Sequence, residues 1–103
     1  MSGTPDPSGK WCIAAGVVCR PCENDDEILV YVGFTGTVHL VAHVGCLAVN
    51  LCQREPRTID EIVQHVRQRY ELEDGTQDEL DGATRDTVNK LHGLGILTPC
   101  TQP

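Results

Sequence analysis

Six cysteines are the residues of this 103-residue chain best suited to chemistry, and two of them form a Cys19-Arg-Pro-Cys22 motif. This spacing is typical of redox-active pairs and of half a zinc site. A redox pair needs a helix N-terminus that lowers the thiol pKa, but here Pro21 and the acidic residues 23–27 follow. Further zinc ligands would have to come from His39, His43, Cys46 or Cys52. A small zinc or redox module therefore stays only as an alternative.

The rest of the chain offers no catalytic motif. His39 and His43 are four residues apart, but the Glu of an HExxH metalloprotease motif is missing. No nucleophile elbow, phosphate-binding loop or dinucleotide-binding glycine motif occurs. We therefore predict that the protein is not an enzyme and needs no cofactor.

Composition restricts the partners. Fifteen acidic and eight basic residues give a net charge of −7, which disfavours nucleic acid. No apolar run approaches the roughly 20 residues of a membrane span, and residues 1–10 lack the pattern of a signal peptide. We expect a cytoplasmic protein that contacts neither nucleic acid nor membrane. The acidic segments 23–27 and 71–86 are interpreted as solvated loops, or alternatively as a rim that attracts a basic peptide.

Three strands are predicted in the first half of the chain. Residues 11–22 favour an irregular edge strand, and the β-branched and aromatic run 28–32 favours a second. Gly33-Phe34-Thr35-Gly36 is a tight-turn sequence, and residues 37–42 alternate with period two. The last two strands therefore form an antiparallel hairpin with one face on a core.

Three helices are predicted in the second half. Val44, Leu47, Ala48 and Leu51 form one helical stripe, and Thr58-Ile-Asp-Glu61 is a capping box that opens a second helix. The apolar stripe of the third helix has helical spacing: Leu80, Thr84, Val88 and Leu91. The fold class is α+β: a three-stranded antiparallel sheet followed by three helices, winged helix-turn-helix-like. Residues 1–10 are predicted as a disordered N-terminal tail, 11–98 as the domain and 99–103 as a C-terminal tail.

Three segments in this order carry a resemblance: Gly36-Thr-Val-His-Leu40, Arg57-Thr-Ile-Asp-Glu-Ile-Val and Leu91-His-Gly-Leu-Gly-Ile-Leu97. Over residues 11–98 the chain resembles the PqqD-like proteins, which are peptide chaperones, or recognition elements, of ribosomally made and modified peptides. It is most similar to the PqqD-type protein of the HPr-related system, which accompanies a kinase-like protein related to HPr kinase.

The resemblance implies a peptide-binding function. The leader segment of a precursor peptide would add as a strand beside the third strand, next to the third helix, and would be presented to a modifying enzyme. The implied contact residues are Thr37, Val38, His39, Leu40, Val41, Arg85, Val88, Asn89 and His92. Among them, His39, Arg85 and Asn89 are expected to touch the peptide, whereas the apolar members are expected in the core: Val38, Leu40 and Val88.

Two experiments and two alternatives follow from this interpretation. A proline at position 39 or 41 should remove a peptide-binding donor if that amide faces the open edge of the sheet. One alternative function is a winged-helix adaptor that docks a protein partner such as the HPr-kinase-like protein. The other is the zinc or redox module based on Cys19 and Cys22.

Overall fold

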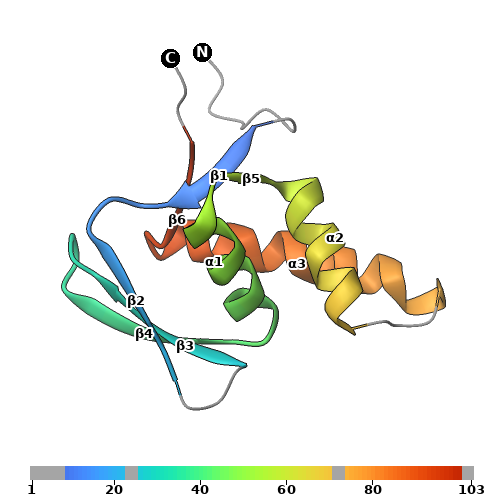
Figure 1. Cartoon of the computed structure of the whole chain (residues 1–103), viewed down its shortest axis with the longest axis horizontal. Coiled ribbons are helices and arrows are strands. Elements are labelled where there is room, and N and C mark those ends of the chain that lie inside the picture. Colours follow the sequence, from blue (N-terminus) through green and yellow to red (C-terminus); the bar gives the residue numbers. More distant parts are fainter. Residues whose placement is uncertain (1–8, 23–25, 71–73, 101–103) are drawn as a thin grey trace.

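The computed structural model describes residues 9–22, 26–70 and 74–100, with the side chains of 74–76 left aside (Figure 1). Its elements follow the order β1 (Lys10–Ile13), β2 (Val17–Pro21), β3 (Glu27–Val32), β4 (Thr37–Ala42), α1 (Val44–Arg54), β5 (Arg57–Thr58), α2 (Ile59–Tyr70), α3 (Asp74–Gly93) and β6 (Leu97–Pro99). The predicted α+β class is confirmed. The predicted tail residues 1–8 and 101–103 lie outside the described residues, as do parts of both acidic segments, 23–25 and 71–73.

The larger sheet contains the predicted hairpin. It has the strand order β2-β3-β4 and is antiparallel throughout, so β4 lies at its edge. Ile28, Val30 and Val32 point from β3 into the core, where they are almost completely buried, because side chains alternate along a strand. The Gly36 amide donates to the Val32 carbonyl oxygen at 2.8 Å and closes the turn between β3 and β4.

The segment 11–22 differs from the expectation of a single strand, because it contains two strands that belong to different sheets. β1 pairs with β5 and β6, whereas β2 pairs with β3. The chain changes direction at Gly16, whose φ of 82° lies in the left-handed region that glycine adopts without a steric penalty. Lys10 and Pro99 lie in strands, so the two described ends of the chain meet in this smaller sheet (Figure 1).

The second helix begins as its capping box predicts, whereas α1 packs through a face other than the predicted stripe. The buried residues of α1 are Gly45, Cys46, Ala48, Val49 and Cys52, and Val44, Leu47 and Leu51 of the stripe are only half-buried. At the start of α2, the Glu61 amide donates to the Thr58 hydroxyl at 3.1 Å, and the Thr58 amide donates to the Glu61 carboxylate at 2.9 Å. This second bond holds the pKa of Glu61 below its usual value. Arg67 of α2 forms an ion pair with Asp81 of α3. In the described part of the chain, no helix is long and apolar enough to cross a bilayer.

His43 joins β4 to α1 in a conformation that suits glycine. Its φ of 56° and ψ of −121° lie in the left-handed half of the map, and its side chain makes no capping hydrogen bond to α1. We expect His43→Gly to raise the free energy of unfolding by about 1 kcal/mol, because glycine relieves the steric strain. Urea denaturation measures this change. His43→Ala, which keeps a Cβ, is the control. An equal gain in the free energy of unfolding from both variants would show that the backbone of His43 is not strained.

Candidate functional site

The backbone hydrogen bonds of β4 show which of its amides face β3. In an antiparallel ladder, pairs of residues that exchange hydrogen bonds alternate with pairs that do not. The His43 amide donates to the Asp26 carbonyl oxygen at 2.8 Å, and this pair continues the β3–β4 register one step beyond Glu27 and Ala42. Every second residue before His43 has the same orientation. Thr37, His39 and Val41 therefore direct their amides and carbonyls toward β3.

The intervening residues of β4 direct their polar backbone groups to the open edge of the sheet: Val38, Leu40 and Ala42. The β2–β3 ladder agrees with this assignment. The Gly33 amide bonds to the Gly16 carbonyl at 3.0 Å, so residues 27, 29 and 31 face β2 and residues 28, 30 and 32 face β4. Within the described residues, β4 therefore offers three residues whose N–H and C=O groups have no strand partner, and these groups can accept a further strand.

A groove of about 400 Å³ lies between this edge and α3. It is lined by Val38, His39, Leu40, Val41, Ala42, Gly45, Thr87, Lys90, Leu91 and Leu94. At its floor, α1 packs very closely against β4. A Cβ on Gly45 would lie only 2.6 Å from Cγ1 of Val41, so a residue without a side chain is needed there.

The β4 side chains divide between two faces. Val41 is buried, with 8% of its surface exposed, but Val38 and Leu40 are 62% and 58% exposed. The expectation that Val38 and Leu40 belong to the core is therefore wrong, since they have the opposite parity to Val41. They form an outer apolar face together with exposed residues of β2 and β3: Val18, Leu29 and Tyr31.

Polar side chains on the other face of β4 are linked to one another. Nε2 of His39 lies 3.1 Å from the Thr37 hydroxyl, which is 2.7 Å from the Thr35 hydroxyl. His39 is half-buried and belongs to the groove lining. This chain of hydrogen bonds restrains the imidazole at the mouth of the groove.

The structure does not bring the four predicted α3 residues to the groove. Arg85 faces α2, where its guanidinium lies 3.7 Å from the Asp60 carboxylate. The His92 ring contacts Trp11 edge-on, with 5.4 Å between ring centroids. Val88 is buried in the core as predicted, and Asn89 is exposed but outside the groove lining.

On the side of α3, the groove is lined by Thr87 and Lys90, which lie on the other flank of the core stripe of that helix, by Leu91 of the stripe itself, and by Leu94, which follows the end of the helix. The stripe of Thr84, Val88 and Leu91 was correctly predicted from its spacing. A stripe has two flanks, however, and helical periodicity does not say which flank faces β4. The sequence feature that could have indicated the groove side is Leu94, which lies between Gly93 and Gly95 and is exposed in the structure.

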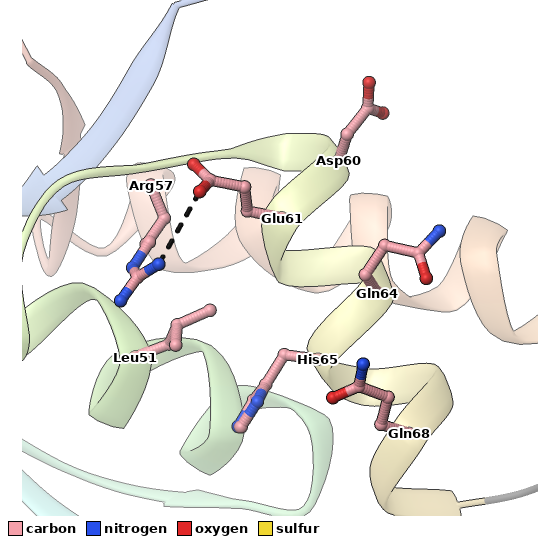
Figure 2. Close-up of a pocket in the computed structure, with 7 residues that line it drawn as sticks. All are labelled: Leu51, Arg57, Asp60, Glu61, Gln64, His65 and Gln68. Atoms are coloured by element: carbon pink, nitrogen blue, oxygen red, sulfur yellow. Dashed lines mark ion pairs between the residues drawn. The ribbon is translucent and has the colours of Figure 1, made fainter.

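A second pocket of about 370 Å³ lies between α1 and α2 and shares no residue with the groove (Figure 2). Figure 2 shows Arg57 paired with Glu61, at 3.5 Å, while Asp60 points away from α1. Burial lowers the pKa of His65, and the nearby Arg54 and Arg57 lower it further. The charged side chains of this lining are already paired, Arg57 with Glu55 and Glu61, and Asp60 with Arg85.

The cysteines show no sign of metal or redox chemistry. None of the six forms a disulfide, and Cys46 and Cys52 are buried. Burial raises the pKa of Cys52 to about 12, which keeps this thiol neutral. Among the residues described, no three histidine, cysteine, aspartate or glutamate side chains are grouped as a metal ion requires. The zinc alternative therefore has no support in this part of the chain.

Comparison with known proteins identifies the fold of this chain. No protein-family model matches the sequence, and no curated protein does. The structure is similar to one solved as TbiB1 in complex with the TbiA(beta) leader peptide, with a TM-score of 0.70. The match covers 88% of this chain and 99% of the other, at 22% sequence identity. This chain therefore has the fold found in that complex.

Proposed function

We propose that the protein is a non-catalytic recognition element that binds the leader segment of a ribosomal precursor peptide as an added strand on β4. The observation that carries the proposal is the open edge of β4. The unpaired backbone groups of Val38, Leu40 and Ala42 run along a groove whose opposite wall is α3. Strand addition of this kind draws affinity from main-chain hydrogen bonds and selectivity from side-chain pockets.

The comparison supports this proposal because a protein of the same fold was solved with a leader peptide. The three sequence segments that resemble PqqD-like proteins point to the same kind of function. On that basis we also propose a partner enzyme, either a peptide-modifying enzyme or a kinase-like protein related to HPr kinase. The protein would deliver the peptide to this enzyme and perform no chemistry itself.

The side chains of the groove suit an extended peptide. Val41, Leu91 and Leu94 give it apolar walls, and burying apolar side chains of a ligand against them is favourable at about 25 cal/mol per Å². On the outer side, Val38 and Leu40 are positioned to form cross-strand pairs with outward-facing residues of the peptide. A segment with apolar residues on both faces fits best.

The proposal is tested by fluorescence anisotropy with labelled peptides taken from short reading frames beside the gene. We expect saturable binding that Leu40→Pro weakens by about tenfold or more. Proline removes the open-edge donor at position 40 and places its ring where the peptide backbone must approach. Leu40→Ala, which keeps the amide, should weaken binding by only about threefold.

The two variants also separate binding from folding. Because the Leu40 amide faces away from β3, Leu40→Pro should leave circular dichroism and the unfolding midpoint nearly unchanged. If a folded Leu40→Pro protein binds the peptides as tightly as the parent, strand addition at this edge is excluded.

A further inference from the structure

The groove has a charge opposite to that of the molecule around it. Only two of its lining residues can carry charge, His39 and Lys90, and both are basic. No aspartate or glutamate lines the groove within the described residues, although the whole chain has a net charge of −7. A cationic site in an acidic protein is a feature that selects ligands by charge.

Lys90 lines the groove and has no acidic partner among the described residues. The other basic side chains without an ion pair there lie outside the groove lining: Lys10, Arg20 and Arg54. Arg57, Arg67 and Arg85 each form an ion pair with a carboxylate. In the part of the chain that the structure describes, no carboxylate lies within ion-pair distance of Lys90, including that of Asp86 one turn earlier on α3. The Lys90 ammonium is therefore available to a carboxylate brought in by a ligand.

The dimensions of the two walls match those of an added strand. The β4 wall covers residues 38–42, about 13 Å at 3.3 Å per residue, and the wall formed by α3 and the following Leu94 covers 87–94, about 10 Å at 1.5 Å per residue. The Leu94 amide donates to the Lys90 carbonyl oxygen at 3.0 Å, as in a helix, so these two residues are separated by about 6 Å along the axis of α3, and alternate side chains of a strand by about 7 Å. Two successive inward-facing peptide side chains can thus contact Lys90 and Leu94 respectively.

Resting on the proposed function, we infer that Lys90 makes the groove selective for peptide segments with an aspartate or glutamate two positions from an apolar residue. The carboxylate accepts a charge-assisted hydrogen bond from Lys90, while the apolar side chain packs on Leu94 and Leu91. A lysine or arginine at the acidic position is repelled by Lys90. Lys90 is thereby a specificity-determining residue, whereas the β4 backbone binds any extended chain.

The test compares each labelled peptide with a version in which every aspartate and glutamate is replaced by asparagine and glutamine. The parent protein should bind the acidic version about three- to fivefold more tightly, the upper part of the range for a solvent-exposed ion pair. Lys90→Gln should abolish the difference, and raising the salt concentration should reduce it. Lys90→Glu should make the neutral version the tighter ligand.

Lys10→Gln is the matched control, since it removes an exposed lysine on β1 and changes the net charge equally. It should preserve the preference for the acidic peptide. If Leu40→Pro weakens binding but the two peptide versions bind the parent and Lys90→Gln proteins alike, the role of Lys90 is overturned while strand addition stands. If no peptide of the set binds, the proposed function fails and this inference fails with it.

Discussion

His39→Pro should lower the free energy of unfolding by about 2 to 4 kcal/mol, while Leu40→Pro leaves it nearly unchanged. The His39 amide belongs to the bonded pair with Val30 in the middle of the β3–β4 ladder. Proline there removes the donor, leaves the carbonyl of a buried β3 residue without its partner and crowds the neighbouring strand. The Leu40 amide faces the open edge, where proline is tolerated.

Urea denaturation followed by the fluorescence of Trp11, the single tryptophan, measures this difference. His39→Ala is the control for the side chain, which contacts only the Thr37 hydroxyl in the described hydrogen-bond network. It should cost less than about 1 kcal/mol, the usual cost of an exposed hydrogen bond. Equal stabilities of the His39→Pro and Leu40→Pro proteins would show that the assignment of β4 amides is wrong.

Proline at position 39 or 41 is therefore not a test of peptide binding at the open edge. Proline at 39 or 41 was expected to block the peptide if those amides face the open edge. The structure places both amides against β3, so loss of binding in those variants would report unfolding and not lost contact. Positions 38 and 40 are the informative ones. Their parity follows from the bond between His43 and Asp26, which lies outside the alternating segment itself.

Local patterns predicted the elements of this fold well. The period-two alternation of residues 37–42, the turn at 33–36 and the capping box from Thr58 to Glu61 are all confirmed. Each depends on side chains within a few residues of one another, so the sequence contains all the information that is needed. The edge position of β4 was implied by the resemblance and not by a local pattern, and the strand order β2-β3-β4 agrees with it.

The residues that line the candidate site could be predicted only in part, because their positions depend on contacts between distant segments. Of the contact residues that the resemblance implies, those of β4 except Thr37 line the groove and those of α3 do not, since the rotation of a helix about its axis depends on every element that packs against it. Arg85 and His92 are held by Asp60 and Trp11, partners that are far away in sequence. Likewise, the alternation of β4 does not say which parity is buried. Contacts with α1 decide this, through Val41 above Gly45.

The smaller sheet was missed for a related reason. β5 has only two residues and β6 three, too few to show a period. Trp11 of β1 lies opposite Arg57 of β5 and Pro99 of β6, so one residue joins three distant segments. The exposure of Trp11 is 7%, and it belongs to the main core cluster. This sheet therefore connects both described ends of the chain to the core.

Trp11→Ala should lower the free energy of unfolding by about 3 to 5 kcal/mol, the range for truncating a buried large aromatic residue. The substitution removes core packing and the edge-on contact with His92. Circular dichroism must follow the transition, because the variant has no tryptophan. Trp11→Phe, which keeps an aromatic ring, should retain most of the stability.

The same variant tests whether the two sheets have separate roles. Trp11 is absent from the groove lining, and β1 does not pair with β2, β3 or β4. At temperatures where Trp11→Ala remains folded, its affinity for peptides that bind the parent should be unchanged within about twofold, since distant sites are usually additive. A small loss of stability would show that β1 is peripheral to the core. The open edge of β4 belongs to the larger sheet. A large loss of affinity in the folded variant would therefore show that the smaller sheet also takes part in binding.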